Sequence, residues 1–159
     1  MDEILEILEK NGRASEEEIA LMLNKSVEEV RGAIKKLEKD NVIVGYNTLI
    51  NWDKSDRENV IALIEVKVTP QRGQGFDKVA ERIYRYPQVK ACYLMSGGFD
   101  LTVIIEGRGM KEVALFVAEK LAPLEGVLST ATHFVLKKYK DEGVVFDEKE
   151  MDDREALIL

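Results

Sequence analysis

The sequence predicts an α+β protein in two parts, in which a helical N-terminal part precedes a part where strands and helices alternate. Two patterns carry this prediction. Residues 2–40 hold three segments with apolar side chains three and four positions apart, the spacing of amphipathic helices. Residues 60–139 hold four runs rich in β-branched residues and two helical segments, in the order β-α-β-β-α-β.

Three helices are expected in the N-terminal part. The first runs from Asp2 to Asn11. The second and third each begin at a capping box, in which a serine accepts from the third helical N–H and a glutamate reaches back. These boxes are Ser15-Glu16-Glu17-Glu18 and Ser26-Val27-Glu28-Glu29. The apolar side chains expected to be buried are Ile4, Leu5, Leu8, Ile19, Met22, Leu23, Val27, Val30, Ile34 and Leu37.

The third helix ends near Asp40 and is followed by two short extended runs. These runs, residues 42–44 and 46–50, flank Gly45 and predict a small hairpin. Three helices with such a wing form a winged helix-turn-helix domain, which we assign to residues 1–52. The polar residues 53–59 are interpreted as a linker.

The second part is predicted to be a ferredoxin-like βαββαβ sandwich over residues 60–140. Its predicted strands are residues 60–69, 89–95, 101–106 and 126–139, and its predicted helices are residues 76–86 and 110–121. Residues 141–159 form an acidic C-terminal tail, in which Val144 to Phe146 are a candidate edge strand. Residues 147–155 are interpreted either as disordered or as part of a helix that packs on a neighbouring subunit through Met151, Ala156 and Leu157.

The composition excludes several classes of protein. No stretch approaches the roughly 18 consecutive apolar residues of a membrane span, and the first residues lack the basic and apolar regions of a secretion signal. The single cysteine, Cys92, predicts a protein of the reducing cytoplasm. Because the chain has one histidine and one cysteine, we expect no metal site, and no motif indicates a cofactor.

The net charge of −7 opposes nucleic-acid binding as a bulk property, because phosphates attract lysine and arginine. The distribution is uneven: residues 1–52 hold seven basic and eleven acidic groups, 53–139 hold thirteen and eleven, and 140–159 hold three and eight. Any DNA contact therefore depends on a local basic patch. The third predicted helix offers one, because its exposed positions include Arg31, Lys35, Lys36 and Lys39.

Three stretches, taken in their order and spacing, form a fairly specific pattern. The first is S-x-x-x-V-x-x-x-I-x-x-L, formed by Ser26, Val30, Ile34 and Leu37, which leads into VIVGY at 42–46. The second is the G-x-x-D turn Gly97-Gly98-Phe99-Asp100, and the third is VLKKYK at 135–140. Together they resemble the Lrp/AsnC family, the feast/famine regulators, over nearly the whole chain.

The resemblance implies a sequence-specific DNA-binding transcriptional regulator whose activity or assembly responds to a small molecule, expected to be an amino acid. The third helix would enter the major groove of double-stranded DNA. The sandwich would form a homodimer through its sheet and assemble further, commonly to octamers. The DNA-binding candidates are Lys25, Ser26, Glu28, Arg31, Lys35 and Lys36. The cations neutralise phosphates, and a glutamate can accept from a cytosine amino group.

The family's effector binds between dimers, near the G-x-x-D turn and the last strand. The effector-binding candidates here are Gly97, Gly98, Asp100, Ser129, Thr130 and Thr132. Bare glycine backbone can approach a zwitterionic ligand and Asp100 can hold its ammonium group, but the same residues also suit a plain hairpin turn that Asp100 fixes. Ser129 and Thr130 face opposite sides of a strand, so only one of these two sides lines a pocket.

Two other functions remain open. One is a ligand-sensing oligomer that has lost DNA binding, which is favoured by acidic Glu28 and Glu29 and by Gly32 and Ala33, where the family often carries arginine. The other is an enzyme like the siroheme decarboxylases, which are similar in architecture. That chemistry needs arginines and a histidine, whereas only His133 is available, so we assign no catalytic residue.

Overall fold

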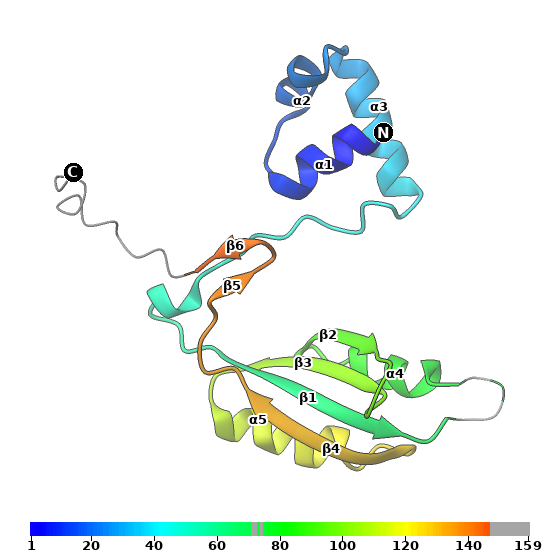
Figure 1. Ribbon diagram of the computed structural model, residues 1–159, viewed down its shortest axis with the longest axis vertical. Coiled ribbons are helices and arrows are strands. Elements are labelled where there is room, and N and C mark those ends of the chain that lie inside the picture. The colour runs from blue at the N-terminus through cyan, green and yellow to red at the C-terminus, as the bar shows by residue number, and fades with distance from the viewer. Residues whose placement is uncertain (71–72, 74, 147–159) are drawn as a thin grey trace, which may run out of the picture. The chain divides into compact units, whose positions relative to one another are not determined.

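The computed structural model describes residues 1–70, 73 and 75–146 (Figure 1). The chain divides into two compact units, Met1–Ile50 and a second that begins at Asn51. The tail residues 147–159, for which the sequence leaves disorder or a helix open, lie outside the described residues.

The N-terminal unit consists of three helices, α1 (Asp2–Lys10), α2 (Glu16–Leu23) and α3 (Val27–Lys39). Their apolar faces meet in one small core. Its buried members are Ile4, Ile19, Ala20, Val30 and Leu37, and Leu5, Leu8, Leu23, Val27 and Ile34 pack around them. The prediction of three helices, and of nearly all their inward-facing side chains, is therefore confirmed.

Both predicted capping boxes are present. Ser15 Oγ accepts from Glu18 N at 3.1 Å, and Glu18 Oε2 accepts from Ser15 N at 2.8 Å. Ser26 and Glu29 make the same pair of bonds at 3.2 and 2.9 Å. Between the boxes, Asn24 ends α2 with a φ of 50°, a left-handed conformation that asparagine adopts more readily than most residues. This tight ending places α3 directly after α2, as a helix-turn-helix requires.

One predicted core residue is wrong. Met22 is 65% exposed, whereas Ala20 is only 4% exposed. Successive residues of an α-helix are about 100° apart, so Ile19, Ala20 and Leu23 share one side of α2 and Met22 lies about 100° from the centre of that stripe. The buried side of α2 therefore includes the small side chain of Ala20 and leaves Met22 outside.

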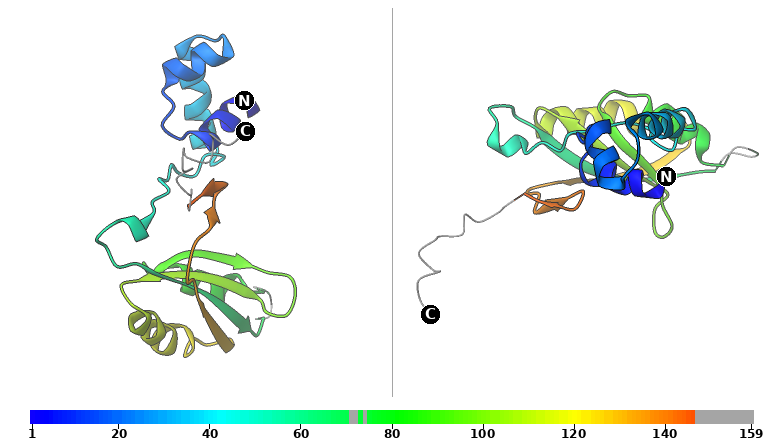
Figure 2. Two further views of the ribbon diagram at one scale, coloured as in Figure 1. Left: turned by 60° about the vertical axis from the view of Figure 1, so that its left-hand side comes forward. Right: turned by 90° about the horizontal axis from the view of Figure 1, so that it is seen from above.

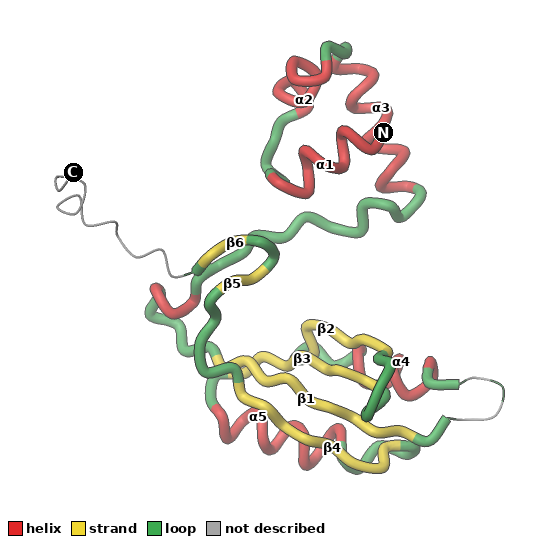
Figure 3. The backbone as a smooth tube through the Cα atoms, viewed as in Figure 1, coloured by secondary structure: helices red, strands yellow, loops and turns green. Residues whose placement is uncertain are grey.

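The predicted hairpin does not form, because residues 42 and 43 bend back toward the end of α3 and residues 44–50 are a loop without strand pairing (Figure 3). A single residue, Gly45, separates the two runs, whereas a tight hairpin turn has two central residues. Tyr46 anchors the segment instead, because its hydroxyl donates to Glu38 Oε1 of α3 at 3.0 Å. The wing position is therefore occupied by a loop, whose residues 42–46 form a groove of about 490 Å³ with α1.

The C-terminal unit combines four main strands with two helices. The strands are β1 (Val60–Val68), β2 (Val89–Leu94), β3 (Leu101–Gly107) and β4 (Val127–Phe134). The helices are α4 (Asp77–Tyr84) and α5 (Met110–Phe116), which continues as the π-helical turn η2 (Val117–Leu121). A short 3₁₀ helix, η1 (Trp52–Lys54), precedes β1. The order β-α-β-β-α-β confirms the predicted ferredoxin-like arrangement.

The four strands pair in the order β2-β3-β1-β4, and every pairing is antiparallel. Both helices lie against one face of this sheet (Figures 1 and 2). Burial alternates along β1, so Ala62, Ile64 and Val66 are fully buried on the helix side. The helical segments contribute Val79, Ile83, Val113, Phe116, Val117 and Leu121 to the same core.

No helix of the C-terminal unit lies on the other face of the sheet in the described residues. Cross-strand partners share a face, so Leu63 on β1 lies there with Ile104 on β3 and His133 on β4. Glu65 belongs to the same face, and its Oε1 lies 3.6 Å from His133 Nε2. This open face therefore mixes apolar and polar side chains.

The last predicted strand is too long. β4 ends at Phe134, although Val135 N still donates to Ile61 O at 2.8 Å. The neighbouring strand β1 begins at Val60, so an antiparallel β4 that continued to Tyr139 would have no partner left to pair with.

A separate two-stranded hairpin follows, formed by β5 (Lys140–Asp141) and β6 (Val144–Val145). Its two turn residues, Glu142 and Gly143, have φ values of 47° and 79°, as a two-residue hairpin turn of type I′ requires. The candidate edge strand near Val144 therefore pairs with its own neighbour and does not extend the main sheet.

Candidate DNA-binding and effector sites

The six DNA-binding candidates are all exposed. Lys25 and Ser26 precede α3, and Glu28, Arg31, Lys35 and Lys36 lie along it. The opposite side of α3 packs into the core through residues such as Val30 and Leu37. One side of α3 thus faces solvent along a helix that the core holds firmly, which is the geometry of a recognition helix.

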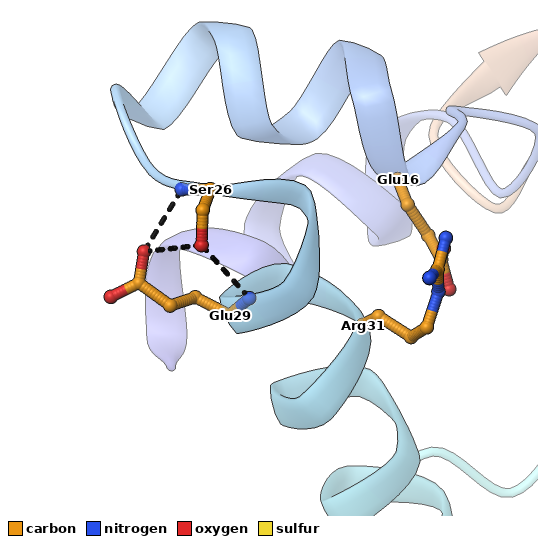
Figure 4. A network of polar contacts seen from close by, with 4 residues as sticks. All are labelled: Glu16, Ser26, Glu29 and Arg31. Carbon is orange, nitrogen blue, oxygen red and sulfur yellow. Dashed lines mark hydrogen bonds and ion pairs between the residues drawn. The ribbon is translucent and has the colours of Figure 1, made fainter.

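A network of polar contacts fixes the start of α3 (Figure 4). Glu29 Oε2 accepts from Ser26 N at 2.9 Å and from Ser26 Oγ at 2.8 Å. These bonds to Ser26, together with the charge of Lys25, hold the pKa of the Glu29 carboxyl below its ordinary value. The Glu29 carboxylate is therefore committed to capping the helix.

Two of the candidate cations already have carboxylate partners. Arg31 Nε donates to Glu16 Oε2 at 2.6 Å, and Lys25 Nζ lies 3.7 Å from Glu3 Oε2 (Figure 4 shows the first pair). The hydrogen bond to Glu16 and the charge of that carboxylate raise the pKa of the Arg31 guanidinium. Both pairs lie at the surface, where such contacts exchange readily with other anions.

Lys35 and Lys36 differ from these paired cations. Among the residues that the structure describes, neither lysine has a hydrogen bond or an ion pair. Because both ammonium groups extend into solvent about one turn after Arg31, they are more available to phosphates than the paired candidates Lys25 and Arg31.

The Gly97-Gly98-Phe99-Asp100 turn connects β2 to β3. Gly97 has a φ of 118°, in the region that favours glycine. Asp100 is held on both sides: its N–H donates to Val66 O at 3.1 Å, and its Oδ2 accepts from Val68 N at 2.8 Å. β3 begins only at Leu101, so the Asp100 carboxylate supplies the partner that the Val68 N–H does not find in that strand.

The start of β4 lies at the same end of the sheet, on the other side of β1. Asp100 bonds to Val66 on one edge of β1, and Thr130 pairs with Val66 on the other edge. Two strand spacings, about 10 Å, therefore separate the turn from this part of β4. The structure brings the glycine turn and the candidate hydroxyls to one end of the unit.

These hydroxyls do not all share one face. Ser129 pairs with exposed Lys67, whereas Thr130 pairs with buried Val66 and lies on the helix side of the sheet. Thr132 lies on the same side as Thr130, because the two residues are two positions apart on one strand. A ligand on either face would meet only part of the candidate set.

Sequence reasoning missed the partners that fix two of the candidates. Glu16 lies 15 positions before Arg31, and Val68 lies 32 positions before Asp100. Both contacts join residues that are distant in the chain, so no local pattern reveals them. The glutamates of α2 had an evident local role only at Glu18, in the capping box.

Within the described residues, no helix is long and apolar enough to cross a membrane. In the same part of the chain, no group of three or more His, Cys, Asp or Glu side chains is placed to hold a metal ion. Cys92 is a free, partly buried thiol, and burial raises its pKa, which disfavours the reactive thiolate.

Both units resemble known protein families. Residues 3–44 match the family model of a winged helix-turn-helix DNA-binding domain, and residues 61–145 match that of the Lrp/AsnC ligand-binding domain. The chain is 55% identical over 153 residues to the uncharacterized HTH-type transcriptional regulator YugG of Bacillus subtilis, and the match covers 96% of this chain and 92% of that protein.

Two solved structures share the fold. The leucine response regulatory protein LrpA of Mycobacterium tuberculosis has a TM-score of 0.74 at 18% identity, over 88% of this chain and 92% of its own. The transcriptional regulator NMB0573 of Neisseria meningitidis, in complex with L-methionine, has a TM-score of 0.69 at 24% identity, over 87% of this chain and 89% of its own. With a helix-turn-helix followed by a βαββαβ unit that matches its ligand-binding domain, the chain belongs to the Lrp/AsnC family of HTH-type transcriptional regulators.

Proposed function

We propose that this regulator binds double-stranded DNA through the exposed side of α3 and the two residues that precede the helix. The contact residues are Lys25, Ser26, Glu28, Arg31, Lys35 and Lys36. One observation carries the proposal: α3 is anchored by a buried stripe while Lys35 and Lys36 extend into solvent. A cationic helix face on a rigid support fits the major groove, where its first turns meet base edges and its cations meet phosphates.

The acidic residues near this face are compatible with that role. Glu29 accepts from the N–H and hydroxyl of Ser26, and Glu16 is neutralised by Arg31. Glu28, at the second position of α3, has no side-chain hydrogen bond or ion pair among the described residues, although its charge acts on Arg31. Its carboxylate suits a cytosine amino group better than a phosphate. The unfavourable charge around the interface is thereby smaller than the composition suggests.

The C-terminal unit is proposed to bind an amino acid at the end of the sheet that carries the Gly97-Gly98 turn. The match to the Lrp/AsnC ligand-binding domain and the L-methionine held by the Neisseria regulator support this ligand class. The exposed glycine backbone offers N–H and C=O groups to a zwitterion. Because Asp100 already bonds to Val68, we assign the direct ligand contacts to the turn backbone and to hydroxyls of β4.

The regulator is also proposed to act as a homodimer that assembles further. The open face of the sheet holds Leu63, Ile104 and half-exposed Tyr93 without a covering helix in the described residues. A second copy would bury these side chains. Sedimentation analysis at micromolar concentration should then give at least a dimer, whereas a monomer would contradict this assignment.

We further propose that the protein works in the cytoplasm by binding and without catalysis. Its only cysteine is free, as expected for a reducing compartment. The raised pKa of that thiol disfavours nucleophilic chemistry at Cys92. The absence of a haem-like absorption band in purified protein would agree with a role that needs no cofactor, and such a band would contradict it.

The testing experiment selects a binding site from a randomised DNA library with the full-length protein. Fluorescence anisotropy then compares the selected duplex with unrelated DNA at two salt concentrations, with and without each common amino acid. The proposal predicts tighter binding to the selected duplex, a fall in affinity with salt, and a shift caused by at least one amino acid. Binding of an amino acid without any salt-sensitive DNA affinity would instead identify a sensor that no longer binds DNA.

A further inference from the structure

A contact between the two helices of the helix-turn-helix bears on how DNA sequence is read. Arg31 is the fifth residue of α3 and Glu16 is the first residue of α2. Arg31 Nε donates to Glu16 Oε2 at 2.6 Å (Figure 4). Both side chains are partly exposed, at 44% and 32%. The pair therefore lies at the surface of the proposed interface, where DNA can approach it.

The chemistry of the guanidinium group determines what this contact leaves available. Arginine carries five N–H donors in a planar fork. Glu16 takes the Nε side, and among the described residues no other acceptor is recorded for Arg31. The edge formed by the two Nη groups remains open. This is a donor pair that can bind guanine O6 and N7 together in the major groove.

Because Glu16 already holds one edge of the Arg31 guanidinium, binding DNA through the other edge loses less conformational entropy. A free arginine side chain has rotamer entropy, part of which is lost when the side chain binds. The contact with Glu16 restricts the side chain before DNA arrives, so less freedom remains to be lost on binding. The core that holds α2 against α3 keeps the two partners in register.

We propose that Glu16 is a positioning residue that holds Arg31 so that its Nη edge reads a guanine. This inference rests on the proposed DNA-binding role of α3. It assigns a recognition role to an acidic residue of α2 that is 15 positions away from its partner. It also explains how a carboxylate can lie beside a DNA-binding helix, since its charge is matched by Arg31.

The sequence provides a matched control for the test. Glu17 is the next residue on α2, carries the same charge and is exposed, but makes no hydrogen bond to Arg31 in the described structure. Glu16→Gln and Glu17→Gln therefore change the net charge equally, and each removes a charge that acts on Arg31, but only the first weakens a hydrogen bond to its guanidinium. Arg31→Ala and the double variant Glu16→Gln/Arg31→Ala complete a cycle.

The measurement repeats the DNA selection with each full-length variant and then determines affinities for the wild-type selected duplex and for unrelated DNA. We expect Glu16→Gln to lose preference for one guanine in each half-site and to weaken specific binding about fivefold. Arg31→Ala should weaken specific binding more, by about tenfold or greater, because it removes the guanidinium that Glu16 positions. Glu17→Gln should keep the guanine, and Glu16→Gln should add no further loss once Arg31 is alanine.

Three outcomes would overturn the proposal. If Glu16→Gln and Glu17→Gln behave alike, the effect is one of general charge. If Glu16→Gln tightens specific binding, Glu16 restrains Arg31 from DNA and does not position it. If Arg31→Ala lowers affinity equally for the selected duplex and for unrelated DNA, and also lowers the salt dependence of binding, then Arg31 contacts a phosphate. An unchanged affinity in Arg31→Ala would instead show that the proposed α3 surface is wrong.

Discussion

The exposed side of α3 and the Gly97–Asp100 turn each place, at a candidate site, a carboxylate that is already hydrogen-bonded. Glu29 caps α3 through Ser26, and Asp100 accepts from the Val68 N–H. The regions differ in what remains for a partner. At α3, side-chain cations remain available to a partner, whereas at the turn the available groups are backbone N–H and C=O groups beside glycine. A charged residue near a site therefore indicates a ligand contact only when its bonding capacity is still free.

The largest effect is expected from removing the free cations of α3. Lys35→Ala/Lys36→Ala should weaken binding to the selected duplex by tenfold or more at low salt. It should also lower the slope of log affinity against log salt by about 2, roughly 0.9 for each lost phosphate contact. Anisotropy titrations over a salt series measure both values.

Lys10→Ala is the control for this double variant, because it removes a cation from the last turn of α1, away from α3. It should leave the salt slope nearly unchanged. Equal salt slopes in the wild-type and double-variant proteins would mean that the two lysines do not contact phosphates. The claim that the free cations of α3 serve DNA binding would then be wrong.

The turn is tested through the bond between Asp100 and Val68. Asp100→Ala leaves the partly buried Val68 N–H without its acceptor, so we expect a loss of about 1–3 kcal/mol in the free energy of unfolding. Asp100→Asn keeps an acceptor oxygen and should recover most of that loss. Denaturant unfolding of both variants, together with amino-acid titration, separates the two roles. A stable Asp100→Ala protein that no longer binds an amino acid would show that Asp100 serves the ligand.

The cap of α3 should give a smaller effect. Ser26→Ala removes the hydroxyl that accepts from Glu29 N, and the loss of an N-cap costs about 1 kcal/mol. Ser15→Ala removes the corresponding bond from α2 and is the matched variant, because it lies outside the proposed DNA contacts. Thermal unfolding should show similar losses for the two. A loss of DNA affinity in Ser26→Ala alone would show that the hydroxyl also contacts DNA.

The smallest expected effect is a pH dependence at Glu29. Its pKa is lowered in the folded protein because the carboxylate accepts hydrogen bonds from Ser26, so the charged form stabilises the native state. This contribution is fully present above the ordinary value of 4.5 and is lost as the pH falls through the lower folded value. NMR titration of the Glu29 carboxyl carbon should give a midpoint below pH 4.5, and in Ser26→Ala this midpoint should move up toward 4.5.

Most of the fold follows from local patterns in the sequence. The capping boxes at Ser15 and Ser26 fix where α2 and α3 begin, and helical or alternating spacing identifies the remaining helices and strands. Two of the errors have local causes too, whereas the overlong last strand reflects where its partner β1 begins. Met22 lies beside the buried stripe of α2, and the segment around Gly45 has too short a turn for a hairpin.

The candidate sites were predictable in position but not in bonding. Exposure of Arg31 follows from helical periodicity, whereas its contact with Glu16 depends on how α2 packs against α3. The neighbourhood of Asp100 and Thr130 likewise depends on sheet order, because β1 must lie between β3 and β4. Long-range pairing of this kind is set by tertiary packing, which no window of the sequence contains.

The most direct test of the α3 assignment is hydrogen–deuterium exchange of the full-length protein with and without the selected duplex. The account predicts that DNA slows exchange in peptides covering residues 25–36 and leaves peptides covering residues 127–134 nearly unchanged. Slower exchange elsewhere in a fully formed complex, with residues 25–36 unaffected, would contradict the claim that α3 is the DNA-recognition surface.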